Sequence, residues 1–137
     1  FQVNVTAAFQ LLQFYYHEFY EQSSIVLVGS PVGLIGAKKP SYAASKAALH
    51  GLMMTSAREL SKRNIRVNLL LPGTVNTPLI GDWDEEKKQS VASKNLQKRL
   101  FEPHEIANTI YFLLSVASSM ISGSTVDTTS GGMLAIH

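Results

Sequence analysis

Apolar residues recur at helical spacing in three long stretches of the chain. Over residues 3–21 they fall three or four positions apart, as on one face of a helix. They are Val5, Ala8, Phe9, Leu12, Tyr15, Tyr16 and Phe19. A second helix is predicted over residues 41–62, with Ser41 as its N-cap and an apolar core stripe. That stripe comprises Leu49, Leu52, Met53 and Leu60. A third follows in "EPHEIANTIYFLLSVAS", where Pro103 and Glu105 suit the first turn.

Short apolar runs between these stretches predict strands. "SSIVLVGS" and "IRVNLLLPG" are continuous, as in strands buried on both faces, and "GSTVDTTSGG" predicts a short strand with glycine turns. "PVGLIGAKKP" is typical of a loop, and the charged residues 78–100 predict one or two short helices. Because apolar strands alternate with long helices, we expect one α/β domain over residues 1–137, with a parallel sheet covered on both faces.

Composition narrows the functional classes. The 137 residues are 45% hydrophobic and 16% charged, which is typical of a globular protein. A net charge of +2 with interspersed acidic residues does not favour a nucleic acid or an anionic membrane as partner. The apolar runs are shorter than the ~20 residues that span a bilayer. The absence of cysteine fits a reducing compartment, so we expect a cytoplasmic protein, and the four histidines lack metal-ligand spacing.

The stretch "SYAASKAAL" places Tyr42 and Lys46 four residues apart. On a helix such residues share one face, with Cβ atoms about 5–6 Å apart. A nearby cation favours the phenolate and lowers a tyrosine pKa from about 10, which suits a general acid or base. The alternative is an ordinary amphipathic helix with both side chains in solvent, and the pair alone does not decide between the two.

Other candidate groups follow the predicted strands. Ser30 comes directly after the first strand, and Pro72 and Gly73 end the second. Tyr42 and Lys46 open the helix after the first strand. Because ligands of open parallel sheets bind beyond the carboxyl ends of the strands, we expect these groups to gather at one edge. A serine hydroxyl there could donate to a substrate oxygen while the tyrosine moves a proton.

Four segments in this order resemble the short-chain dehydrogenase/reductase family. They are "VNVTAAF", "IVLVGS", "YAASKAAL" and "RVNLLLPGTVNTPL". The resemblance is to the classical branch that includes beta-ketoacyl-carrier-protein reductase. It extends over essentially the whole chain, through "RL-x-EP-x-E-I-A" at residues 99–107 to the "SG…GG" ending. It implies a Rossmann-like, doubly wound parallel sheet that lacks the N-terminal βαβαβ half.

The resemblance also implies catalytic roles. Tyr42 matches the catalytic acid/base, and Lys46 matches the residue that lowers its pKa and bonds the nicotinamide ribose. Ser30 matches the group that polarises the substrate carbonyl, and Asn4 the residue that holds a water linking Lys46 to a proton path. Asn4 could instead simply start a helix, and Ser30 could be a loop hydroxyl. Ser30 lies twelve residues before Tyr42, one fewer than is common in the family, and is followed by an unusual proline.

The cofactor assignments rest on the same resemblance. The turn that holds the nicotinamide end matches Pro72, Gly73, Val75 and Thr77, and residues 79–100 match the substrate lid. Thr77 could merely cap the following segment. "GSPVGLIG" is not interpreted as a phosphate cradle, because Lys38, Lys39 and Pro40 separate it from the next helix.

The resemblance implies an oxidoreductase that uses NADP or NAD and a small carbonyl or alcohol substrate. The Gly-rich fingerprint and the residue that selects between the cofactors have no counterpart among these residues. The chain opens on Phe1 and looks like the later part of a longer protein, so we expect it to bind a dinucleotide weakly or not at all by itself.

An epimerase or dehydratase of the same family is disfavoured, because those usually carry a larger C-terminal substrate domain. In the family the two long helices, here residues 3–21 and 41–62, commonly pack against a twin subunit, which implies a homodimer or homotetramer. Aromatic residues on the first helix suit that interface, although an ordinary core explains them equally well. They are Phe9, Phe14, Tyr16 and Phe19. The alternative function is a truncated, non-catalytic fragment that associates through these helices.

Overall fold

The centre of the molecule is a three-stranded parallel sheet. The computed structural model describes residues 1–134, so residues 135–137 of the predicted domain lie outside the described residues. The strands are β1 (Ser24–Val28), β2 (Arg66–Pro72) and β3 (Thr125–Thr128), in the order β1-β2-β3. The register pairs Ser24 with Arg66 and Leu69 with Thr125. The predicted parallel arrangement is confirmed.

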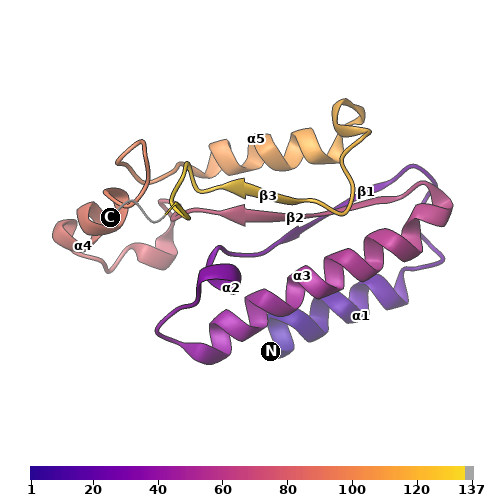
Figure 1. Cartoon of the computed structure of the whole chain (residues 1–137), viewed down its shortest axis with the longest axis horizontal. Coiled ribbons are helices and arrows are strands. Elements are labelled where there is room, and N and C mark those ends of the chain that lie inside the picture. Colours follow the sequence, from indigo (N-terminus) through magenta and orange to yellow (C-terminus); the bar gives the residue numbers. More distant parts are fainter. Residues whose placement is uncertain (135–137) are drawn as a thin grey trace.

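Helices cover both faces of this sheet (Figure 1). Helix α3 (Pro40–Leu60) lies on one face with α1 (Ala7–Phe14) beside it, and α5 (Pro103–Leu114) lies on the other. Two short helices, α2 (Val32–Ile35) and α4 (Glu85–Ala92), lie at the end of the molecule to which the strands point. This is the α/β Rossmann-like architecture that the sequence predicted.

The core forms where α3 packs on β2. Side chains from Val67 to Leu71 are all buried, as expected for a strand covered on both faces. Against them lie Leu49, Met53, Ala57 and Leu60 of α3. Each fully buried aliphatic side chain contributes about 1.5–3 kcal/mol, so this pair of elements fixes the frame. The prediction that β1 is also fully buried is wrong: it pairs only with β2 among the described residues, and its side chains stay partly exposed.

The first helix is shorter than predicted. Residues Gln2–Thr6 form a π-helical turn, and α1 ends at Phe14 instead of residue 21. Beyond it, the guanidinium of Arg63 donates hydrogen bonds to the backbone carbonyls of Tyr16 and Phe19. A side chain more than forty residues away therefore binds these carbonyls. Residues 15–18, which were predicted to be helical, form non-helical turns.

Helix α3 begins one residue earlier than predicted, and the preceding loop is partly helical. Pro40 occupies the first helical position, which its fixed φ suits, and Lys39 is the N-cap. Ser41 therefore lies inside the first turn, and the prediction that it caps the helix is wrong. The α-helix ends at Leu60, and a short 3-10 turn continues it through Arg63.

The segment 79–100 forms short helices, as expected from its charge pattern. A 3-10 turn covers Pro78–Ile80, and α4 follows, with the carboxylate of Asp84 accepting from the N–H of Lys87 at 2.7 Å. After α5, a 3-10 turn at Val116–Ser118 leads toward the last strand, β3. Helix α5 begins where the sequence predicted, with Pro103 and Glu105 in its first turn, but it ends at Leu114, four residues before the end of the predicted stretch.

Candidate active site

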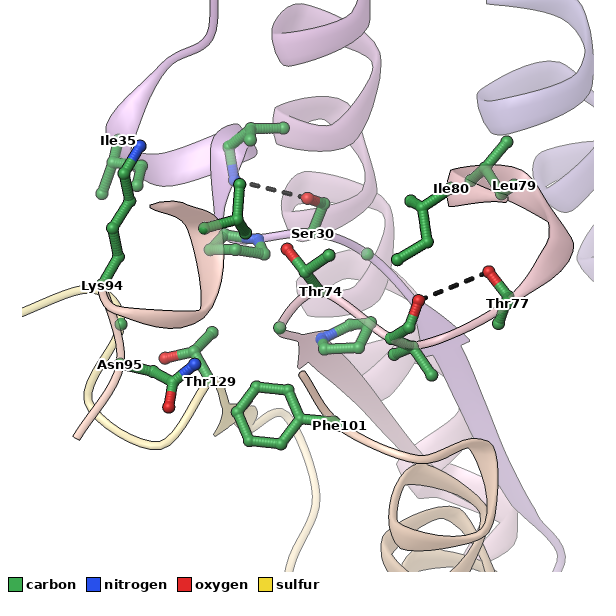
Figure 2. A pocket seen from close by; sticks show the side chains of 18 of the residues that line it. Ser30, Ile35, Thr74, Thr77, Leu79, Ile80, Lys94, Asn95, Phe101 and Thr129 are labelled. Atoms are coloured by element: carbon green, nitrogen blue, oxygen red, sulfur yellow. Dashed lines mark hydrogen bonds between the residues drawn. The ribbon is translucent and has the colours of Figure 1, made fainter. Parts of the chain in front are cut away.

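A cleft of about 820 Å³ opens at the carboxyl ends of the three strands. Its walls come from the residues that follow β1, β2 and β3, from the first turn of α3, and from the segment 79–101. Figure 2 shows Ser30 and Thr74 between two walls, one with Thr77 and Ile80 and the other with Lys94 and Asn95, and Phe101 below them. The cleft therefore lies where open parallel sheets bind ligands.

Ser30 and Tyr42 both line this cleft, although they come from different elements. Ser30 stands two residues beyond β1, and its Oγ accepts a long bond from the N–H of Val32, at 3.4 Å. That contact uses an oxygen lone pair and leaves the hydroxyl hydrogen for another acceptor. Tyr42 lies in the first turn of α3 and is 41% exposed, so its side chain is open to a small molecule.

Lys46 lies one helical turn after Tyr42, as the spacing predicted. Its Nζ is 6.0 Å from the centre of the Tyr42 ring, at the outer limit of a cation–π contact. The ammonium also donates to the backbone carbonyl of Val28, the last residue of β1, at 3.3 Å. Partial burial removes water from this group and lowers the pKa of Lys46 from its ordinary value.

Asn4 reaches the same helix from the π-helical turn. Its Nδ2 donates to the Oγ of Ser45 at 3.2 Å, and Ser45 in turn donates to the backbone carbonyl of Tyr42 at 2.8 Å. Ser45 is 1% exposed, so this link is sheltered from water. Asn4 is thereby connected to the turn of α3 that carries both Tyr42 and Lys46.

The end of β2 and the loop after it bring the four positions matched to the nicotinamide turn to the cleft, whereas Lys46, the predicted ribose ligand, does not line it. Pro72, Gly73, Val75 and Thr77 line the cleft. A side chain at Gly73 is excluded, because an added Cβ would lie 2.3 Å from the Phe101 ring. Within residues 1–134, the backbone N–H of Val75 donates to no other residue.

Phe101, which follows the segment 79–100, is joined by backbone hydrogen bonds to the loop after β2. Its N–H donates to the carbonyl of Thr74 at 3.1 Å, and its carbonyl accepts from Asn76 at 2.8 Å. This isolated parallel bridge between Val75 and Phe101 closes the two ends of the segment 79–100 against each other. The segment therefore leaves the sheet and returns to it beside the candidate cofactor loop.

Comparison with known proteins identifies the family. A family model described as enoyl-(acyl carrier protein) reductase matches residues 1–133. A structure from Francisella tularensis, described as a short chain dehydrogenase family protein, superposes with a TM-score of 0.88 at 28% identity. It covers 94% of this chain and 58% of the other. The chain belongs to the short-chain dehydrogenase/reductase family.

Curated relatives in this family are enzymes roughly twice as long. The chain is 37% identical over 127 residues to 3-oxoacyl-(acyl-carrier-protein) reductase FabG of Thermotoga maritima, covering 90% of this chain and 52% of the relative. It is 35% identical to human (3R)-3-hydroxyacyl-CoA dehydrogenase over 80% of this chain and 42% of that one. The angucycline C-6 ketoreductase LanV, solved with bound NADP, has a TM-score of 0.89 at 26% identity and matches 96% of this chain and 52% of its own. The chain spans about half the length of the curated relatives it matches.

Some residues of the cleft were missed from the sequence. Thr129, Phe101, Lys94 and Trp83 line the cleft of this short-chain dehydrogenase/reductase. Lys94 and Trp83 lie within the predicted lid segment 79–100, but none of the four was named as a site residue. For Thr129 a signal existed, since "VDTT" ends the third strand and strand ends were already used to select Ser30 and Gly73. For the other three, folding of the segment 79–101 over the sheet decides, and local patterns do not report it.

The described residues meet neither the requirements of a metal site nor those of a membrane-spanning helix. In the part of the chain that the structure covers, residues 1–134, no three His, Asp or Glu side chains gather in a way that could hold a metal ion. The helices among those residues are all too short or too polar to cross a bilayer.

Proposed function

We propose that this chain is the catalytic part of an oxidoreductase that transfers a hydride between NAD(P)H and a carbonyl or secondary alcohol. The observation that carries the proposal is that Ser30 and Tyr42 line one cleft, with the Lys46 ammonium 6.0 Å from the phenol ring. Relatives in the family are named as reductases and dehydrogenases, which supports the same reaction class.

Proton transfer is the protein's share of this reaction. The Ser30 hydroxyl donates a hydrogen bond to the carbonyl oxygen and fixes its position. As the carbonyl becomes an alcohol, Tyr42 gives its phenolic proton to that oxygen, and in the reverse direction it takes the proton back. The ammonium of Lys46, one turn along the helix, stabilises the phenolate that Tyr42 becomes.

Asn4 acts as a positioning residue in this proposal. Its bond to Ser45, and that of Ser45 to the carbonyl of Tyr42, join the π-helical turn to the first turn of α3. This link holds the backbone between the phenol and the ammonium in one geometry. A water beside Asn4 that leads to Lys46 is compatible with that place in the fold.

The residues present fit a nicotinamide cofactor. The unpartnered N–H of Val75 suits a carboxamide oxygen, and Pro72, Gly73 and Thr77 border the same space. Tyr42 and Lys46 would hold the ribose next to it. The bound cofactor supplies the hydride. NADP and NAD are both candidates, and the bound NADP of LanV supports the first.

Properties of the whole protein follow as parts of the same proposal. The segment 79–100 serves as the lid over a small-molecule substrate, and the protein works in the cytoplasm as a homodimer or homotetramer. Phe9 and Phe14 are 50% and 76% exposed, which supports an interface on that side of α1. Tyr16 and Phe19 pack instead against the core, so only half of the predicted aromatic stripe is free for a twin subunit.

Substitution of Tyr42 by Phe tests the proposal in a protein that joins this chain to its Gly-rich half. The change keeps the ring and removes the proton that the reaction needs. We expect NADPH-dependent reduction of a ketone panel to fall by ~10²–10⁴-fold with an unchanged circular dichroism spectrum. Tyr111→Phe, at a 77% exposed position of α5, is the matched control. Near-normal rates for Tyr42→Phe would rule out the assignment.

A second candidate is a non-catalytic fragment that associates through α1 and α3. It is favoured by the exposed aromatic side chains on α1. The coding region upstream separates the two candidates. A Gly-rich half in frame favours the enzyme, and a stop codon favours the fragment.

A further inference from the structure

Trp83 is the single tryptophan of the chain, and it lines the cleft from the segment 79–100. Its side chain is partly exposed, so a ligand in the cleft can reach it. The backbone on both sides of the indole is fixed. The N–H of Trp83 donates to the carbonyl of Ile80 at 3.1 Å, and the next residue, Asp84, accepts from the N–H of Lys87 at 2.7 Å and so caps α4.

Lys87 covers one face of the indole ring. Its Nζ is 4.1 Å from the ring centre, well inside the ~6 Å limit of a cation–π contact. Within residues 1–134 this ammonium forms no salt bridge, whereas that of Lys88 pairs with Glu85 at 2.9 Å. Trp83 lines the cleft and Lys87 does not. The ammonium therefore lies on the side of the ring away from the cleft, and the opposite face of the indole is left for a ligand.

The wall of the cleft around Trp83 is apolar. Ile80 and Val91 line it from the same segment, and Ile80 is buried while Val91 is partly buried. No Asp or Glu side chain lines the cleft within residues 1–134. The part of a ligand that meets the indole is therefore a hydrocarbon. It is either a saturated chain or a flat, π-bonded group.

The position of Lys87 favours the flat group. Partners that carry positive charge, such as a cation or the edge of a C–H bond, prefer the electron-rich face of an aromatic ring. The Lys87 ammonium draws the π electrons of the indole toward itself, so the face toward the cleft is less rich in electrons. Such a face attracts a saturated chain less, and it stacks well on an electron-rich π system in an offset geometry.

We propose that Trp83 is a specificity-determining residue that stacks on a flat, π-bonded part of the carbonyl substrate, and that Lys87 is a positioning residue that holds the indole from the other side. The substrate class is then a ketone with an electron-rich aromatic ring, instead of one with a saturated alkyl chain. This inference rests on the proposed function, because it takes the reacting carbonyl to lie at Ser30 and Tyr42.

Paired ligands can measure this contact on the 137-residue chain itself, since every lining residue belongs to it. The probes are benzylacetone, its cyclohexyl analogue, and homologues with a longer spacer between ring and ketone. Ligand-observed NMR gives the affinity of each, and the fluorescence of the single tryptophan reports stacking directly. For at least one spacer, Trp83→Leu lowers the ratio of phenyl-ketone to cyclohexyl-ketone affinity by about two- to tenfold, the factor of one aromatic pair.

Two variants control for the loss of an aromatic ring as such. Trp83→Phe keeps a ring at the cleft and retains most of the wild-type ratio. Tyr111→Leu makes an aromatic-to-aliphatic change at a 77% exposed position of α5, outside the cleft, and retains the whole ratio. Circular dichroism spectra show that each variant is folded before its affinities are compared.

Lys87→Met tests the positioning role, because methionine keeps an unbranched stem and removes the charge. The probes are benzylacetones with a para-methoxy or a para-trifluoromethyl group. We expect the wild type to prefer the electron-rich methoxy ring more strongly than Lys87→Met does, and Lys87→Arg to restore that preference. Lys88→Met is the matched control, since its ammonium pairs with Glu85 instead of a ring. A merely structural role of Lys87 in α4 would not depend on the ring substituent.

The outcomes separate this inference from the proposed function. If Trp83→Leu leaves the ratio of phenyl to cyclohexyl ketone unchanged, Trp83 has no such role while the carbonyl site stands. If Lys87→Met keeps the full preference for the methoxy ring, the positioning role of Lys87 is wrong. Ser30→Ala tests the carbonyl site independently: if it weakens the binding of no ketone, the proposed function fails even where the ratio depends on Trp83. If no probe binds the wild-type chain, both are overturned.

Discussion

The two ends of the sheet use polar side chains in opposite ways. At the amino end, Arg66 donates four hydrogen bonds into the connection between α5 and β3. Asn68 is fully buried there and uses both ends of its amide, with Ile121 at 2.8 Å and Ser124 at 3.1 Å. These groups are satisfied by the protein itself.

At the carboxyl end the polar groups are left open. Within residues 1–134 the phenol of Tyr42, which is 41% exposed, makes no hydrogen bond, and the hydroxyl hydrogen of Ser30 is unused. Other residues of the fold position these groups. Ser45 donates to the carbonyl of Tyr42, and the carbonyl of Val28 accepts from Lys46. The backbone of α2 also packs closely on α3 at Gly33.

This difference separates structural from functional polar residues. A buried polar group that the fold satisfies contributes to stability, and its loss should unfold the protein without a specific effect on ligands. A cleft-lining group that the fold leaves unsatisfied contributes little to stability, and its loss should change binding or turnover. The predictions below test the structural side, from the largest expected effect to the smallest.

Substitution of Arg66 by Met should destabilise the amino end of the sheet and lower the free energy of unfolding. Four acceptors lose a charged donor: the Leu113 and Ser115 carbonyls, the Ser118 hydroxyl and the Ile121 carbonyl. Because Arg66 is partly exposed and water can replace some of these bonds, we expect a loss of about 2–4 kcal/mol in the free energy of unfolding. Urea denaturation measures it. Arg58→Met, at an exposed position of α3, is the control, and an equal effect at both sites would contradict the comparison.

Substitution of Gly33 by Ala should disturb the packing of α2 on α3 at the carboxyl end of the sheet and destabilise the protein. An added Cβ would lie 2.7 Å from the carbonyl carbon of Lys46 and 2.8 Å from the N atom of Ala47. Helix α2 would have to move away from α3, which costs about 1–3 kcal/mol in the free energy of unfolding.

The control for Gly33 has the opposite sign. Gly51 lies inside α3, where an added Cβ meets nothing within 4 Å. Gly51→Ala should therefore stabilise the protein by about 0.5–1 kcal/mol, because alanine loses less backbone entropy in a helix. If Gly33→Ala also stabilises the protein, α2 is not held by close contact with α3.

Helical and strand patterns were sufficient to predict β2, α3 and α5. Each presents a continuous or periodic apolar set. Those of β2 and α3 are buried largely as expected, whereas α5 fully buries Leu113 alone and leaves Tyr111 and Leu114 exposed. The pattern over residues 3–21 was equally regular, but Arg63 takes the carbonyls of Tyr16 and Phe19 and the helix stops at Phe14. A contact over more than forty residues is absent from any local pattern.

The sequence also predicted part of the candidate site. Strand ends and the four-residue spacing placed Ser30, Tyr42 and Gly73 around one space because sheet topology brings them there. The reason for Gly33 was not predictable, since it concerns how closely α2 approaches α3. Nor was the bridge between Val75 and Phe101, which depends on the path of the segment 79–100.

The smallest effect concerns the ion pair that fixes the end of that segment. Arg99 donates to both carboxylate oxygens of Glu105, at 2.6 and 2.8 Å, and Glu105 also accepts from the N–H of Glu102. The Arg99 hydrogen bonds and this backbone N–H lower the pKa of Glu105 to about 2. Since the folded-state pKa lies below the unfolded value, the stabilising contribution is fully present above about pH 4.5 and is lost as the pH falls through about 2.

Glu105→Gln tests this pH dependence. Glutamine keeps an acceptor for the N–H of Glu102 but removes the charge that Arg99 holds. We expect the variant to be slightly less stable than the wild type near neutral pH, and the two unfolding free energies to converge as the pH approaches 2. Urea denaturation at several pH values measures the difference, and an NMR titration reports the Glu105 carboxyl directly. A constant difference from pH 7 to pH 2 would mean that the charge of Glu105 does not hold the segment 79–100 at the first turn of α5.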